Sequence, residues 1–102
     1  MSNQALTEAV YYILLSLTKP MHGYGIMQNV EKLSNGRVKL AAGTLYGALN
    51  TLLEKGWISA LSDENKSRKK EYLITDNGKE VLYSEIDRLK ELIENGNKIL
   101  EV

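Results

Sequence analysis

One stretch of the chain, AAGTLYGALNTLLEKGWI at residues 41–58, combines hydrogen-bonding side chains with unusually small neighbours. Leu45, Leu49 and Leu52 have the spacing of one buried helix face. The other side holds small and uncharged polar residues instead of the Glu and Lys of an ordinary solvated face: Gly43, Thr44, Gly47, Asn50 and Thr51. Because each helical glycine costs about 1 kcal/mol relative to alanine, we expect this face to approach another surface closely.

The sequence offers little for covalent or metal chemistry. It has no cysteine and a single histidine, His22, whose place at an expected helix start favours a structural role. It shows no Ser-His-Asp arrangement, metal-ligand spacing or cofactor motif. Near the C-terminus, carboxylates are expected to pair with neighbouring cations on a solvated helix face: Glu80, Asp87, Glu91 and Glu94 with Lys79, Arg88, Lys90 and Lys98. We therefore expect no enzyme activity, no metal and no cofactor.

Charge is unevenly distributed along the 102 residues, although the net charge is zero. Residues 1–70 carry nine Lys or Arg against five Asp or Glu, and residues 71–102 carry four against eight. The basic part includes KSRKK at residues 66–70. The start of the chain does not resemble a secretory signal, and no apolar run approaches the ~18 residues of a membrane span. These features favour a cytoplasmic protein.

Apolar periodicity predicts three helices, a β-hairpin and a final long helix. The first helix runs from about residue 6 to 18. The second begins near Gly23, a candidate N-cap, and ends at Asn35-Gly36. The third ends at Gly56. Residues 57–61 and 69–74 read as the hairpin, and RVKL at 37–40 as a very short strand.

The last helix is expected to begin at Thr75 as its N-cap and to bend or fray at residues 95–97. This element order predicts a mostly α fold with a small β-hairpin (α+β): a winged helix-turn-helix followed by one long C-terminal dimerisation helix. The expected divisions are 1–75 for the winged helix-turn-helix DNA-binding domain and 76–102 for the dimerisation helix, packed as one compact unit.

In a helix-turn-helix, the second helix of the pair enters the DNA major groove. The third helix has side chains suited to that position, and the candidate base-contacting residues are Thr44, Gly47, Asn50 and Thr51. The hairpin could neutralise phosphates through Lys66, Arg68, Lys69 and Lys70. Under an alternative interpretation, the glycines only allow close packing between helices inside the protein.

Three segments, HGYGI, GTLYGALNTLLEKGWI and RKKEYLITDNG, resemble the PadR family of bacterial winged-helix regulators. The single last helix resembles the short, one-domain subgroup. The resemblance implies a homodimer that represses transcription and releases DNA when a small molecule binds, with Tyr24 and Tyr46 near the DNA backbone. The chain departs from the family at Ala41-Ala42, which leaves the third helix without its usual cap, and at Glu71, which replaces a tyrosine.

The last helix carries an apolar seam of the coiled-coil type, expected to form the dimer interface: Leu82, Ile86, Leu89 and Ile93. Surplus apolar groups on the first and last helices form a candidate pocket for a small aromatic or otherwise apolar ligand: Tyr11, Tyr12, Leu15 and Tyr83. Alternatively, these tyrosines fill the dimer core. Drug-binding relatives carry a tryptophan where this chain has Leu89, and Trp57 is expected to pack in the core.

The sequence therefore predicts a cytoplasmic, homodimeric DNA-binding repressor that recognises an inverted-repeat operator in double-stranded DNA. Two other functions fit the same fold, because a fold does not fix a function. One is a winged-helix module for protein–protein interaction without specific DNA binding. The other is a scaffold whose main role is to capture a ligand.

Overall fold

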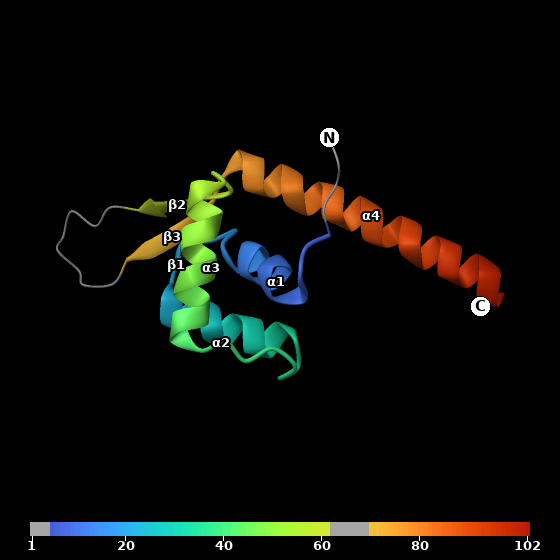
Figure 1. Cartoon of the computed structure of the whole chain (residues 1–102), viewed down its shortest axis with the longest axis horizontal. Helices are drawn as coiled ribbons and strands as arrows, with labels where there is room; N and C mark the ends of the chain where they lie inside the picture. The colour runs from blue at the N-terminus through green and yellow to red at the C-terminus, as the bar shows by residue number, and fades with distance from the viewer. Residues whose placement is uncertain (1–4, 62–69) are drawn as a thin grey trace.

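The structure, a computed structural model, describes residues 5–61 and 70–102. Helix α1 lies at the centre, with α2, α3 and α4 around it and a small sheet at one end (Figure 1). In chain order the elements are α1 (Glu8–Ser16), β1 (Met21–His22), α2 (Gly23–Leu33), α3 (Ala42–Glu54), β2 (Ile58–Leu61), β3 (Glu71–Ile74) and α4 (Asp76–Leu100). The predicted fold class, a winged helix with a long C-terminal helix, is confirmed.

The hydrophobic core is centred on α1. The Thr7 hydroxyl caps this helix by accepting a hydrogen bond from the Val10 amide. Ile13, Leu14 and Leu17 have no exposed surface. Their neighbours in the core come from every other helix and from β2 and β3: Ile26, Val30, Leu45, Leu49, Leu52, Ile58, Tyr72, Ile74 and Leu82. One apolar cluster therefore holds the helices and the sheet together.

The sheet has three antiparallel strands in the order β1-β3-β2. The predicted hairpin is present, with Ile58 opposite Ile74. The sequence analysis missed β1, which pairs Met21 with Tyr72. Two residues are too short to show strand alternation. The prediction of a strand at residues 37–40 was wrong: that segment forms no strand, and its alternation reflects Val38 and Leu40 packing against the core.

Helix α2 begins differently from the prediction. The N-cap is His22 and not Gly23, because the His22 imidazole Nδ1 accepts a hydrogen bond from the Gly25 amide at 3.2 Å. Glycine has no side-chain acceptor with which to cap a helix in this way. The expected structural role of His22 is confirmed. Among the described residues, no three His, Cys, Asp or Glu side chains are grouped so that they could hold a metal ion.

The predicted ends of the second and third helices and the predicted start of the last helix are confirmed, whereas α1 is two residues shorter at each end than the predicted 6–18. Asn35 and Gly36 have positive φ values of 53° and 82° after α2, and Gly56 has 76° after α3. As expected from Ala41, α3 has no side-chain N-cap. The Thr75 hydroxyl accepts a hydrogen bond from the Gly78 amide and donates one to the Gly56 carbonyl at 2.7 Å. Thr75 therefore starts α4 and also fixes it to the end of α3.

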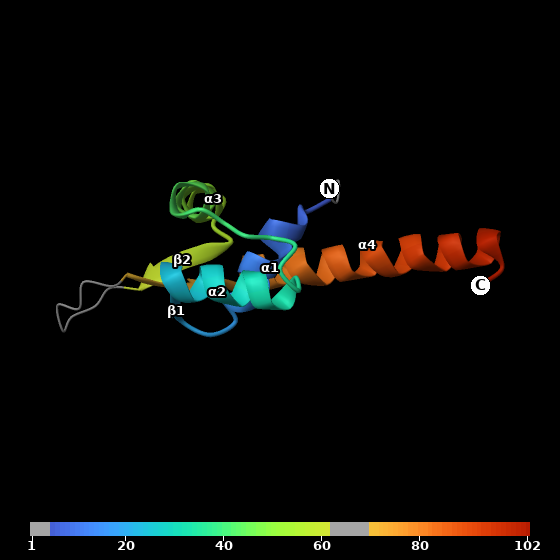
Figure 2. The same ribbon diagram turned by 90° about the horizontal axis from the view of Figure 1, so that it is seen from below.

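Helix α4 is continuous, and it projects well beyond the other elements (Figures 1 and 2). The expected bending or fraying at residues 95–97 does not break the helix, which runs through them to Leu100, because a single interior glycine such as Gly96 costs only about 1 kcal/mol. The distal half exposes Leu92, Ile93 and Ile99. Among the described residues, no helix combines the length and the apolar character that crossing a membrane requires.

A buried carboxylate anchors the proximal half of α4. Glu85 is only 4% exposed, and it accepts hydrogen bonds from Arg88 Nε at 2.7 Å and Nη2 at 2.8 Å. It also accepts one from the Leu6 amide at 3.1 Å, which ties the segment before α1 to α4. The sequence analysis overlooked Glu85 and expected Arg88 to pair with exposed acids. The Arg88 hydrogen bonds lower the pKa of Glu85, against the opposing effect of burial.

Two glycines of α4 allow a matched stability test. A Cβ at Gly78 would collide with the Trp57 carbonyl oxygen and lie 2.6 Å from Ile74 Cγ1, whereas a Cβ at Gly96 would meet nothing within 4 Å. We expect Gly78→Ala to destabilise the fold by about 3 kcal/mol or more, and Gly96→Ala to stabilise it by about 0.5–1 kcal/mol. Urea denaturation measures both, and equal effects would contradict the close approach at Gly78.

The lowered pKa of Glu85 predicts a pH-dependent contribution to stability. That contribution is present above the unfolded-state pKa of about 4.3, and it is lost as the pH falls through the lower pKa of the folded state. We expect Glu85→Gln to cost about 1–3 kcal/mol at neutral pH and to flatten the loss of stability between neutral and acidic pH. Asp87→Asn, at an exposed site, is the control. A wild-type pH profile in Glu85→Gln would contradict this role.

Candidate nucleic-acid interface

Helix α3 presents an open face of small residues. Thr44, Gly47, Asn50 and Thr51 are all exposed. A Cβ added to Gly43 or Gly47 would meet no atom within 4 Å, so these glycines do not serve packing within the described chain. The Thr51 hydroxyl donates a hydrogen bond to the Gly47 carbonyl at 3.2 Å. Figure 2 views α3 almost end-on, at the side of the molecule away from α4.

Tyr46 connects the start of α2 to α3. A Cβ at Gly23 would collide with the Tyr46 hydroxyl oxygen and lie 2.8 Å from Tyr46 Cζ, so the phenol ring lies over the Gly23 backbone. Tyr46 also helps to raise the pKa of Tyr72, although burial of Tyr72 is the larger cause. The Tyr46 ring remains 46% exposed, and Tyr24, in the first turn of α2, is 63% exposed. Two phenols are therefore available to solvent beside the N-terminus of α2.

The wing is the hairpin of β2 and β3, and the structure describes its two strands but not residues 62–69 between them. Lys70 is exposed directly before β3, whereas Lys66, Arg68 and Lys69 lie outside the described residues. Strand β3 buries Tyr72 and Ile74 and leaves Glu71 exposed opposite Leu61 and His22. The basic segment, residues 66–70, therefore comes directly before β3, and the buried side chains of β3 fix the sheet to the core.

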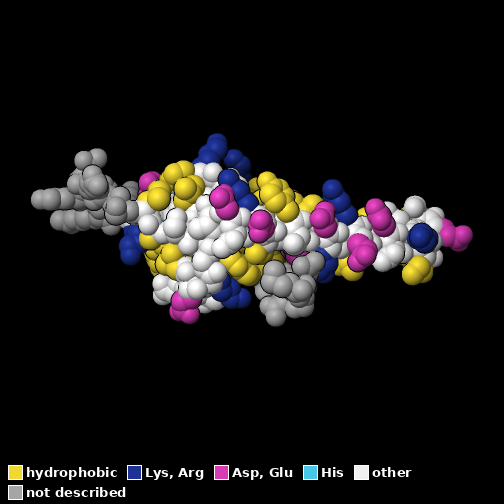
Figure 3. All heavy atoms as spheres, turned by 90° about the horizontal axis from the view of Figure 1, so that it is seen from above, with side chains coloured by type: hydrophobic (Ala, Val, Ile, Leu, Met, Phe, Trp, Pro, Cys, Tyr) yellow, Lys and Arg dark blue, Asp and Glu magenta, His cyan; other side chains and the backbone are white. Residues whose placement is uncertain are grey.

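The four predicted interface residues on α4 differ in burial. Leu82 is buried in the core, Ile86 and Leu89 are half-buried, and Ile93 is 61% exposed. Seen from above, hydrophobic patches alternate with Asp and Glu side chains along the length of the molecule (Figure 3). The exposure of the seam residues therefore increases along α4, from Leu82 in the core to Ile93 on the projecting half of the helix.

The predicted ligand residues are only partly grouped. Tyr11 and Tyr12 meet edge-on with ring centroids 5.8 Å apart, and both pack against the core, as does Leu15. Tyr83 is 65% exposed. Trp57 packs against the core, as expected.

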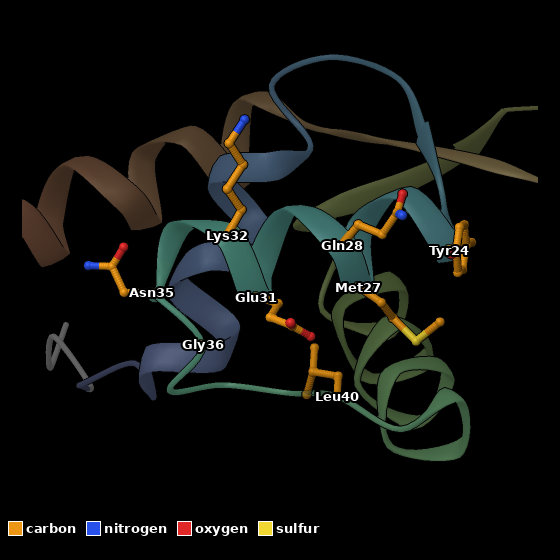
Figure 4. A pocket seen from close by; sticks show the side chains of 8 residues that line it. All are labelled: Tyr24, Met27, Gln28, Glu31, Lys32, Asn35, Gly36 and Leu40. Atoms are coloured by element: carbon orange, nitrogen blue, oxygen red, sulfur yellow. The ribbon is translucent and has the colours of Figure 1, made fainter.

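Neither of the two pockets described is lined by Tyr11, Tyr12, Leu15 or Tyr83. The larger, of about 670 Å³, follows the outer side of α2 and the turn after it. Figure 4 shows Glu31 and Leu40 directed toward one another there, while Lys32 points away. The smaller, of about 300 Å³, lies between the segment before α1 and the C-terminal half of α3. The larger pocket is formed within residues 24–40. The smaller joins residues 5–10 to residues 48–57, and the sequence analysis could not foresee it because these segments are distant along the chain.

Solved structures share this architecture. A transcriptional regulator from Clostridium thermocellum superposes with a TM-score of 0.73 at 22% identity, over 89% of this chain and 87% of that chain. A PadR-like transcription factor from Bacteroides fragilis superposes with a TM-score of 0.69 at 28% identity, again over 89% and 87% of the two chains.

Sequence comparison agrees with the structural comparison. An uncharacterized 37.1 kDa protein in transposon TN4556 of Streptomyces fradiae is 37% identical over 73 residues, which are 72% of this chain. The match spans only 20% of that longer relative. The model of the transcriptional regulator PadR-like family matches residues 12–84, from α1 into α4. The chain therefore belongs to the PadR-like family of transcriptional regulators.

Proposed function

We propose that this protein is a cytoplasmic, homodimeric repressor that binds an inverted-repeat operator through α3 and is released by a small ligand. The main support for DNA recognition is the open face of α3, where Gly43 and Gly47 have no packing role in the described chain. The major groove is about 12 Å wide, and a helix fits it best when its outward residues are small or contact bases.

Base contacts are assigned to the polar residues of this face. The Asn50 amide can pair with an adenine edge through two hydrogen bonds, and threonine methyl groups can pack against a thymine methyl group. Thr44 and Thr51 supply hydroxyl and methyl groups on the same exposed side. Gly47 leaves room for the bases to approach the helix backbone.

Backbone contacts are assigned to the phenols and the wing. Tyr24 and Tyr46 are exposed beside the N-terminus of α2, where free amide groups and the helix dipole favour a phosphate. Lys70 is exposed at the wing, and Lys66, Arg68 and Lys69 complete the basic segment. Such contacts add affinity without sequence preference.

Dimerisation is assigned to α4. Ile93 and Leu92 are exposed on the projecting half of the helix, and a second copy would cover the seam that Leu89 and Ile86 continue toward the core. We assign release of the protein from DNA to a small aromatic or apolar ligand. It would bind between α1 and α4, near Tyr11, Tyr12, Leu15 and Tyr83. Such a ligand shifts the equilibrium only if it binds the DNA-incompetent arrangement more tightly.

Selection of bound sequences from random duplex DNA tests the central proposal. We expect an inverted repeat whose half-sites lie about 34–36 Å apart. Gly47→Leu should then lower affinity for the selected duplex by at least about tenfold, because the side chain intrudes into the groove while the fold has space for it. Gly47→Ala is the control for the backbone effect of losing glycine.

Urea denaturation should show that both Gly47 variants are at least as stable as the parent, because each replaces a glycine inside a helix where a side chain has space. Undiminished DNA binding by Gly47→Leu would contradict the assignment of α3. Failure to enrich any DNA sequence would instead favour a protein-interaction module.

The dimer prediction is tested with Ile93→Asp. Since Ile93 is exposed in the single chain, aspartate should not disturb the fold of the protomer. Across a symmetric interface, however, two carboxylates would be desolvated together. We expect sedimentation to show monomers and the affinity for the full operator to fall. Asn95→Asp adds the same charge at a neighbouring exposed position and should leave the dimer intact. A dimer in Ile93→Asp would exclude Ile93 from the interface.

A further inference from the structure

The smaller pocket differs in position and composition from the proposed site between α1 and α4. Its volume is about 300 Å³, at the lower end of small-molecule pockets. Leu6 and Val10 line it from the N-terminal side, Ala48 and Leu52 from α3, and Trp57 from the segment after α3. Leu52 is almost fully buried, and the other four are half-buried. The walls therefore offer apolar contact to a compact guest.

The polar lining residues are Thr7 before α1, Thr51 on α3 and Lys55 at the C-cap of α3, and Lys55 alone among them is charged. Lys55 is the charged lining residue, and its Nζ lies 4.6 Å from the centroid of the Trp57 ring. The side chain of Lys55 is exposed, so its ammonium group is available to a guest. No acidic residue lines the pocket among the described residues. The combination of an indole, aliphatic walls and one free cation selects for an apolar molecule with a single negative charge.

The N-terminal wall is held in place by the structure itself. The Leu6 amide donates to the buried Glu85 carboxylate, and Thr7 caps α1. Glu85 is in turn fixed by two hydrogen bonds from Arg88. The opposite wall belongs to α3, whose Leu49 and Leu52 are core residues. Because both walls are anchored, a guest would find the pocket formed before it binds, which lowers the cost of binding.

We propose that this pocket binds a small organic anion with a compact apolar body, whose charged group is held by Lys55. The apolar body lies among Leu6, Val10, Ala48 and Trp57. The inference does not depend on DNA binding, because it rests on the pocket alone.

Three probes of one shape separate the contributions of the apolar walls and of Lys55: cyclohexylacetate, 2-cyclohexylethanol and 2-cyclohexylethylammonium. Trp57 is the only tryptophan in the chain, so its fluorescence reports on this pocket directly, without DNA. We expect all three to change the emission of Trp57 in a saturable way. The anion should bind about two- to fivefold more tightly than the alcohol, since ion pairs at exposed lysines are modest, and the cation should bind more weakly than the alcohol.

Two variants complete the test. Lys55→Met keeps the aliphatic stem and should abolish the preference for the anion, whereas Lys90→Met, at an exposed site on α4, should retain it. Ala48→Leu should fill the pocket and weaken binding of all three probes at least tenfold, with circular dichroism as the check on folding. The proposal is overturned if the parent shows no saturable response, if Lys55→Met keeps the anion preference, or if a folded Ala48→Leu protein binds as the parent does.

Discussion

Burial of α1 is the constraint on which the other elements depend. Ile13, Leu14 and Leu17 are fully buried, and one short helix can reach that state only if neighbours cover it on several sides. Helices α2 and α4 pack against it, and the Ile74 amide of β3 donates to the Leu17 carbonyl at 2.8 Å. The positions of the wing and of the long helix are therefore both set from α1.

This arrangement leaves two surfaces uncovered for different reasons. The leucines of α3 pack in the core. The opposite face, with its glycines and polar residues, therefore points outward, and no other part of the described chain packs against its glycines. Helix α4 is fixed at its start by Thr75 and Gly78 and further along by Glu85. Beyond that anchor it projects, and its apolar residues become exposed. The open face of α3 and the exposed apolar residues of α4 are thus both consequences of one core.

Most of the fold could be predicted from local sequence patterns. The leucine spacing in residues 45–52 predicted α3 and its outward face, and Thr75 predicted the start of α4, because periodicity and capping depend on residues within one or two helical turns. The motifs around Tyr24, Tyr46 and residues 68–78 also indicated the family. The sequence could not reveal the two-residue strand β1, and it overrated the effect of Gly96 on a helix whose other residues favour continuity.

The sequence by itself determined the four helices, the hairpin and their order, and the composition of the α3 face. Only the tertiary structure decided which distant groups meet: Tyr46 over Gly23, Glu85 with the Leu6 amide, and Lys55 and Trp57 beside the segment before α1. The physical reason is that such contacts depend on how helices pack around α1. Glu85 shares its sequence surroundings with the exposed acids of α4, and only packing against the N-terminal segment buries its carboxylate and gives it an amide partner.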